Sequence, residues 1–245
     1  MAQIKSASTT VTLTFYTMAR HGKKYLAALK LVEAERLYTT AEAVELLMKT
    51  HTVKFDQTIE IHFNLAVDPK YADQMVRSTI SLPHGSGKVV KVGAFTDLGN
   101  AEELKKLGAM VAGGDDLLDE VASGKIDFDV AIATPGMMKK MGKVAKVLGP
   151  KGLMPNPKAG TVGEDLVKII GELMAGKFEF KNDKQGNVHS ILGRVSFGAD
   201  KIKANLEYFL KVIKEVRPTG IKGGQYINSI SVCNAMGPGI KLETK

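Results

Sequence analysis

The hydrophobic pattern of this chain changes twice along its length, and these changes restrict the folds that are open to it. Residues 58–65 alternate strictly between polar and apolar side chains, which predicts a half-buried strand. Between residues 89 and 134, short apolar strands alternate with short helices in the order βαβαβ, which is typical of a parallel sheet covered by helices. Beyond Pro157 the earlier style returns. We therefore predict an α/β protein of two domains: a split α+β domain of two layers with an antiparallel sheet, and an inserted Rossmann-like α/β domain of three layers.

The segment before the insert predicts two helices and one strand. Apolar residues recur at helical spacing over residues 22–38, and Thr39 with Glu42 forms a capping box for a second helix that ends near Lys49. On the strand that follows, alternation places one set of side chains on the polar face: Thr58, Glu60, His62 and Asn64. One face of this strand is therefore free for a ligand.

The segment after the insert predicts the rest of the split domain. The expected elements are a helix that Thr161 and Glu164 cap and that ends at Gly176, a hairpin of strands 177–181 and 187–191, a helix over 200–216, and a last strand over 226–233. Strand 58–65 alone is too little sheet to be stable. We expect it to pair with the hairpin and with the last strand.

This pairing makes the middle of the chain an insertion with two crossings. We expect the split domain to comprise residues 18–67 and 158–245, and the insert to comprise residues 68–157. The crossings near Val67 and Pro157 predict a hinge and relative motion of the domains. Residues 1–17 are an N-terminal extension rich in Ser and Thr. They are interpreted as a disordered tail or as the result of a start codon upstream of Met18, with an organellar transit peptide as the alternative.

Charge points to a polyanionic partner. The formal net charge is +8 and the isoelectric point is near 9.3. Because basic side chains release counterions from phosphates, nucleic acid is the favoured partner, with a membrane surface as the rival. No run approaches the roughly 18 apolar residues that a bilayer span requires. The single Cys excludes an internal disulfide and fits a reducing compartment.

Motifs for catalysis and metal binding are weak. The loop at residues 82–89 lacks the Walker pattern, because Leu82 stands where the first Gly belongs and Val89 where Ser or Thr belongs. The dinucleotide fingerprint fails at Val90. The histidines are scattered, with no Cys or carboxylate at ligand spacing. We expect no catalytic residue, metal, cofactor or small-molecule substrate, and an enzyme built on the Rossmann-like insert stays as the alternative.

Residues 134–161 contain lysines and no acidic side chain. The lysines are Lys139, Lys140, Lys143, Lys146, Lys151 and Lys158. A solvated helix face followed by a rigid connector would explain the charges alone. The absence of acids and the ordered path set by Pro150, Pro155 and Pro157 go beyond what a solvated face needs.

The stretch Gly-Pro-Lys-Gly-Leu-Met-Pro-Asn-Pro-Lys-Ala-Gly-Thr at residues 149–161 closely resembles the signature of the bacterial-type L-one family of large-subunit ribosomal proteins. Further motifs match the family in order. They lie at residues 18–25, 54–60, 81–85, 127–129, 133–135, 180–184 and 236–238. The resemblance runs from Met18 almost to the C-terminus.

The resemblance implies a non-enzymatic protein whose split domain binds large-subunit rRNA at the mobile stalk. It also implies help in releasing deacylated tRNA from the exit site, and repression of the protein's own operon through its mRNA leader. The expected location is the cytoplasmic ribosome, or an organellar ribosome if residues 1–17 are a targeting remnant. Membranes are not expected partners.

The family's RNA-contacting positions carry over to Lys54, Phe55, Thr58, Glu60, Asp183, Lys184, Ser229, Met236 and Gly237. Polar side chains on the strand suit ribose hydroxyls and base edges, the lysines suit phosphates, and Phe55 offers a stacking surface. Ala235 departs from the family, which has a small hydroxyl residue there; this predicts weaker affinity unless Asn234 compensates. Secondary contacts with tRNA or RNA backbone are expected at Lys139, Lys140 and Lys143.

Overall fold

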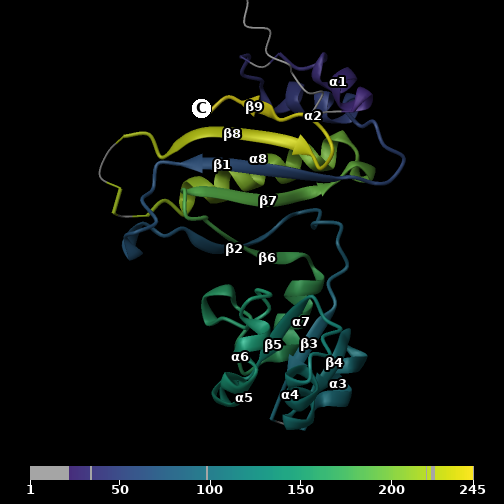
Figure 1. The fold of residues 1–245 in the computed structure, drawn as a ribbon, viewed down its shortest axis with the longest axis vertical. Helices are drawn as coiled ribbons and strands as arrows, with labels where there is room; N and C mark the ends of the chain where they lie inside the picture. Colours follow the sequence, from purple (N-terminus) through teal and green to yellow (C-terminus); the bar gives the residue numbers. More distant parts are fainter. Residues whose placement is uncertain (1–21, 34, 98, 219, 222–223, 245) are drawn as a thin grey trace, which may run out of the picture.

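The computed structural model describes residues 22–33, 35–97, 99–218, 220–221 and 224–244, so the predicted extension 1–17 lies outside the described residues. Figure 1 shows two lobes, the first with the antiparallel strands and the second with the parallel ones. The predicted α/β class, with a two-layer antiparallel part and a three-layer parallel part, is confirmed. In the part of the chain that is described, no helix combines the length and apolar character of a membrane span.

The first lobe contains an antiparallel sheet with the order β7-β1-β8-β9. Its strands are β7 (Asn187–Arg194), β1 (Thr58–Leu65), β8 (Ile227–Asn234) and β9 (Ile240–Leu242). As predicted, strand 58–65 pairs with the last long strand, and its other neighbour is β7. The short β9 was not predicted, because three residues carry too little alternation to be recognised.

Two helices cover one face of this sheet, α2 (Thr40–Lys49) and α8 (Ala199–Glu215). The predicted capping box of α2 is present, since Thr39 accepts from the Glu42 amide and Glu42 accepts from the Thr39 amide. The apolar side chains of β1 are buried beneath α8, where Phe63 stacks on Phe209 with ring centroids 5.4 Å apart. The polar side chains of β1 consequently face away from both helices.

The first predicted helix is shorter than expected. Helix α1 (Lys23–Leu29) ends well before Tyr38. Tyr38 instead forms a parallel bridge with Leu242 of β9, with hydrogen bonds to the backbone of Lys241 and Glu243. The prediction of helix over 22–38 was therefore wrong beyond residue 30.

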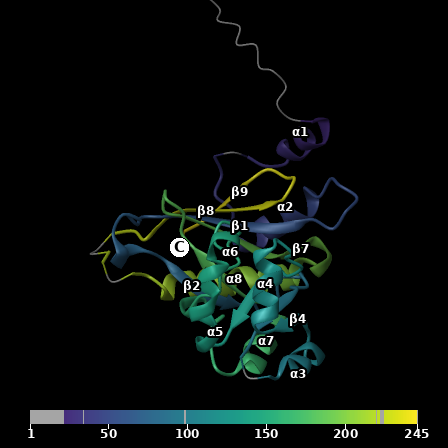
Figure 2. The same ribbon diagram turned by 60° about the horizontal axis from the view of Figure 1, so that its bottom comes forward.

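The second lobe has a parallel sheet with the order β4-β3-β5, formed by β3 (Val92–Phe95), β4 (Ala109–Gly113) and β5 (Val130–Ala133). The predicted βαβαβ order is confirmed by α3 (Ala101–Lys106) and α4 (Asp115–Ala122) between these strands. One face packs against α4 and the following α5 (Pro135–Lys140) and α6 (Ala145–Leu148); the other packs against α3 and α7 (Leu166–Met174). Figure 2, in which this lobe comes forward, shows the helices gathered around its short strands. Short 3-10 turns complete the fold at Ala72–Gln74, Met141–Lys143, Pro157–Ala159 and Val195–Phe197.

The predicted hairpin was wrong. Strand β6 (Lys177–Lys181) pairs with β2 (Arg77–Ser81), which was not predicted, whereas β7 pairs with β1. The turn-forming residues 182–186 do reverse the chain, but they pass it from one sheet to the other. Turn chemistry predicts a reversal without specifying which strand lies beside each arm.

The start of α7 also differs from the expectation. Asp165 caps this helix by accepting from the Lys168 amide, whereas the hydroxyl of Thr161 bonds to Asn156. The predicted end is correct, since Gly176 follows the last turn with φ of +91°.

The predicted domain boundaries were residues 67 and 157. In the structure, the chain passes from the core of one lobe to the core of the other some way after each of these positions. Ile80 and Leu82 belong to the core of the first lobe, and Ile170 and Leu173 pack on the parallel sheet of the second. We propose domain boundaries close to Leu82 and Gly176 on this basis, with β2 and β6 forming the two-stranded connection.

Candidate nucleic-acid interface

The face of the first sheet opposite the helices is lined by polar side chains in cross-strand register. Glu60 lies opposite Cys233, His62 between Ser231 and His189, and Asn64 between Ser229 and Asn187. We call this surface, formed by the outward side chains of β1, β7 and β8, the open face. Strand β1 alone extends it over about 23 Å at about 3.3 Å per residue. In Figure 1 these strands lie in front of α8.

Two loops border the open face where β1 begins. The loop before β1 exposes Lys54 and Phe55, the latter at 56%, and the loop after β8 exposes Met236 at 58%. They are joined by hydrogen bonds from the Met236 amide to the buried Gln57 side chain, 3.0 Å, and from the Ala235 amide to the Thr58 carbonyl, 3.0 Å. The predicted contacts from the two ends of the chain therefore share one rim of the face.

Asp56 anchors the first of these loops. Its carboxylate accepts from the amide and the hydroxyl of Ser196, at 3.0 and 2.8 Å. These bonds, with the Arg194 charge nearby, hold the pKa of Asp56 below its ordinary value. The exposed pair Lys54 and Phe55 is thus displayed from a fixed turn.

Gly237 and its neighbours form a tight turn after β8. The Gly237 amide donates to the Asn234 carbonyl at 2.8 Å, and a Cβ at Gly237 would stand 3.1 Å from the Asn234 Cβ. Asn234 itself is buried and donates to the Leu47 carbonyl beneath the sheet, at 2.7 Å. Asn234 therefore points away from the open face and does not replace the missing hydroxyl at Ala235.

The turn between β6 and β7 borders the opposite end. The carboxylate of Asp183 accepts from the Gln185 and Asn187 amides, both at 2.8 Å, and these bonds, that of Asn187 foremost, lower its pKa. Lys184 is exposed beside it. Asp183 therefore stabilises the turn, and Lys184 places a positive charge at its surface.

The centre of the open face contains a group that the sequence reasoning missed. Nδ1 of His62 lies 2.9 Å from Nδ1 of His189, and Nε2 of His62 lies 3.3 Å from Sγ of Cys233. Burial, and then the neighbouring His189, lower the pKa of His62, whereas burial and Glu60 raise the pKa of Cys233 to about 11. The alternation of residues 58–65 indicated that His62 shares a face with Glu60, but only the strand register brings Cys233 to them.

The predicted secondary contacts lie in the second lobe, on α5 and the turn after it. The apolar residues of this segment, including Met137, Met141 and Leu148, are fully buried in the core of the lobe. Lys139 and Lys143 are exposed, but Lys140 binds Asp115 of α4 at 2.8 Å. The segment itself contains no acidic residue, as the sequence shows, but in the folded chain Asp115 from another helix offsets the charge of Lys140.

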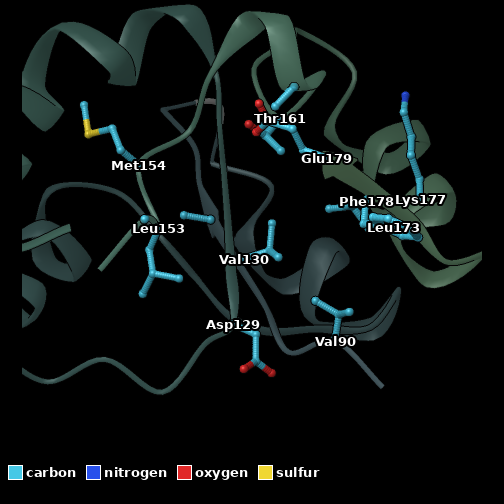
Figure 3. Close-up of a pocket in the computed structure, with 13 residues that line it drawn as sticks. Val90, Asp129, Val130, Leu153, Met154, Thr161, Leu173, Lys177, Phe178 and Glu179 are labelled. Atoms are coloured by element: carbon cyan, nitrogen blue, oxygen red, sulfur yellow. The ribbon is translucent and has the colours of Figure 1, made fainter. Parts of the chain in front are cut away.

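Two hollows were candidates for a small-molecule site. One is a pocket between β6 and the second lobe, lined by Leu153, Met154 and Phe178 among others (Figure 3). Its volume is about 300 Å³. Its charged groups are paired elsewhere, Lys177 with Glu172 and Asp129 with Lys88. The other is the Gly-rich loop of residues 85–88, whose start is held on α8 because the buried Asn205 side chain accepts from the His84 amide and donates to the Gly85 carbonyl. These contacts fit a structural loop.

Fold and surface together define a two-lobed α/β protein with an open polar sheet face, a form suited to contact with another macromolecule. The model of the ribosomal protein L1p/L10e family matches residues 47–238, and the chain belongs to this family. The resemblance read from the sequence is confirmed.

Relatives match nearly the whole chain. Large ribosomal subunit protein uL1 of Fervidobacterium nodosum is 50% identical over 227 residues, which cover 92% of this chain and 96% of the relative. The proteins of the same name are 46% identical in Solidesulfovibrio magneticus, over 93% of this chain and 97% of the relative, and 47% identical in Lactobacillus gasseri, over 92% and 98%.

Proposed function

We propose that this chain is a structural constituent of the large ribosomal subunit and binds large-subunit rRNA of the mobile stalk through the open face and its bordering loops. The names of the relatives support the ribosomal assignment. The observation that carries the RNA site is the convergence of every carried-over position on one side of the first sheet. They lie on β1, on β8, in the two loops at one rim and in the turn at the other.

The side chains of this surface suit RNA better than a partner that is bound through its negative charge alone. Glu60 repels phosphates, so its carboxylate needs a donor, and RNA offers ribose hydroxyls and base amino groups. Lys54 and Lys184 stand at opposite rims, where they can neutralise phosphates on either side of the polar strip. Exposed Phe55 adds an apolar surface on which an unpaired base can stack.

Filter binding tests the proposal with two RNAs of equal length, the stalk fragment of the large-subunit rRNA and an unrelated structured RNA. We expect clear preference for the stalk RNA at physiological salt. Equal affinity for both at all salt concentrations would remove the basis for a specific site.

We further propose that the second lobe contacts exit-site tRNA through Lys139 and Lys143 and so assists its release. Lys140 contributes less, because Asp115 already neutralises it. Reversing both charges, Lys139→Glu with Lys143→Glu, should slow tRNA release from ribosomes while stalk binding stays intact. Lys106→Glu, an exposed lysine on α3, is the matched control. Unchanged release in the double variant would contradict this role.

Repression of the protein's own operon follows if its mRNA leader imitates the stalk. A reporter joined to that leader should be repressed by the wild type and released from repression by Glu60→Ala, because both RNAs use one surface. Association with ribosomes in the cytoplasm is expected, and co-sedimentation with large subunits in a fractionated extract tests it.

The proposed function has no catalytic step. Calorimetry with nucleotides at millimolar concentration examines the alternative, an enzyme that uses the loop at residues 85–88. We expect no heat of binding, and a saturable signal would favour the enzyme.

A further inference from the structure

Three side chains with different metal-ligand chemistry converge at the centre of the open face. The carboxylate of Glu60, the imidazole of His62 and the thiol of Cys233 offer one ligand atom each, and these atoms lie within 4.8 Å of one another. All three residues are partly exposed, so an ion in solution can reach them.

The sheet itself produces this convergence. Glu60 and His62 are two residues apart on β1 and thus share a face, and Cys233 is the direct cross-strand neighbour of Glu60 on β8. Ligands placed by paired strands are held more precisely than ligands on loops. The arrangement needs no loop movement to form.

Two of the three ligand separations are close to those of a tetrahedral site. With bonds of about 2.0–2.3 Å from zinc to nitrogen, oxygen or sulfur, tetrahedral geometry places the ligand atoms about 3.3–3.8 Å apart. Nε2 of His62 lies 3.3 Å from Sγ of Cys233 and 3.8 Å from Oε2 of Glu60. The nitrogen–sulfur separation falls within that interval. The nitrogen–oxygen separation is a few tenths of an ångström longer than the roughly 3.3–3.5 Å that bonds to nitrogen and oxygen give, so the Glu60 carboxylate has to move slightly toward the ion.

The surroundings orient the imidazole for this task. Nδ1 of His62 faces Nδ1 of His189 at 2.9 Å, and Nε2 of His189 faces the carboxylate of Asp183 at 3.7 Å. If the ring proton of His62 is on Nδ1, its Nε2 lone pair points at Cys233 and Glu60. Metal-binding histidines are commonly oriented by such a partner on the other ring nitrogen.

We propose that Glu60, His62 and Cys233 form a binding site for Zn²⁺, with the fourth position open to solvent. A thiolate, an imidazole and a carboxylate together select a borderline cation such as Zn²⁺ over Mg²⁺ or Ca²⁺, which prefer oxygen ligands. On binding, the Cys233 sulfur exchanges its proton for the metal and the proton passes to solvent. Glu60 and His62 donate lone pairs without losing a proton.

Cobalt provides a sharp test, because Co²⁺ substitutes for Zn²⁺ and a thiolate ligand produces a charge-transfer band in the near ultraviolet. The chain contains one Cys, so such a band can arise only from Cys233. We expect the full-length protein to develop this band and tetrahedral visible bands with Co²⁺, and to lose them when Zn²⁺ is added.

Variants assign the ligands. Cys233→Ser should abolish the charge-transfer band, and His62→Gln should weaken Co²⁺ binding at least tenfold, with folding verified by circular dichroism. His189→Gln should retain the band but lower affinity by about 10–100-fold, as expected for a positioning residue. His84→Gln, an exposed histidine outside the cluster, is the matched control and should bind as the wild type does.

A wild-type protein without the band at millimolar Co²⁺ would overturn the proposal, as would equal affinity in the wild type and His62→Gln. The titration uses free protein without RNA. Its failure is therefore distinguishable from a failure of the proposed rRNA binding, which is measured without added metal.

Discussion

The open face of the first lobe and the lysine-rich helices of the second lobe are two different kinds of surface, and under the proposed function each would contact RNA in its own way. On the open face, cross-strand register fixes Glu60, His62 and Asn64, and few of the groups are basic. On α5 and the turn after it, Lys139 and Lys143 are exposed ends of long side chains whose helix buries its apolar side. Phosphate contacts position a protein on RNA, whereas fixed polar groups select the RNA. Under the proposed function, the more basic region is therefore not the region that selects the RNA.

The largest effect is expected when the support of the open face is removed. Phe63 is 1% exposed and stacks on Phe209, so Phe63→Ala should lower the free energy of unfolding by about 3–5 kcal/mol. rRNA binding should fall with it, as measured by urea denaturation followed by circular dichroism and by filter binding. Met137→Ala, in the core of the second lobe, is the counterpart. This variant should be less stable, but its folded form should bind rRNA with unchanged affinity. If both variants lost affinity equally, the proposed difference between the two lobes would be wrong.

Removing a negative charge from the open face should weaken binding to a polyanion. Glu60→Ala leaves an RNA donor unpaired and is expected to cost about 1–3 kcal/mol of rRNA binding. Glu45→Ala, on the helix-covered side, removes the same charge at an exposed site and should leave affinity equal or slightly higher. If Glu60→Ala bound more tightly, general charge attraction would explain the binding and the face would have no selective role.

A lysine at the rim should behave like those of the second lobe. Lys54→Ala is expected to weaken all RNAs alike and to reduce the slope of log affinity against log salt by about 0.7–0.9. Lys203→Ala, exposed on α8, serves as the control. If Lys54→Ala weakened the affinity for stalk RNA alone, Lys54 would be one of the residues that select the RNA, which would contradict this prediction.

The smallest effect concerns acid. The pKa of Asp183 is lowered in the fold from its ordinary 3.8, so its contribution to stability is present above that pH and is lost as the pH falls through the folded value. Asp183→Asn should therefore reduce the slight loss of stability below about pH 4, measured by denaturation at a series of pH values. An unchanged pH profile would show that the turn does not depend on the carboxylate.

Elements with strong internal patterns could be predicted, and pairings across the chain could not. The alternation of β1, the apolar stripe of α8 and the βαβαβ order each lie within a short stretch of sequence. The β2–β6 pair and the Cys233 contacts depend on residues about a hundred or more positions apart, which periodicity does not report. Asp115 and Lys140 are only 25 positions apart, but they lie on different helices, and the pattern within either helix does not show that the two side chains meet.

The strand order β7-β1-β8-β9 has a consequence for synthesis. Strand β8 lies beside β1, yet it is synthesised after every element of the second lobe. A nascent or prematurely terminated chain can thus hold a folded second lobe without a finished open face. Under the proposed function, a chain that stops before β8 would therefore lack part of the rRNA site even though its second lobe is folded.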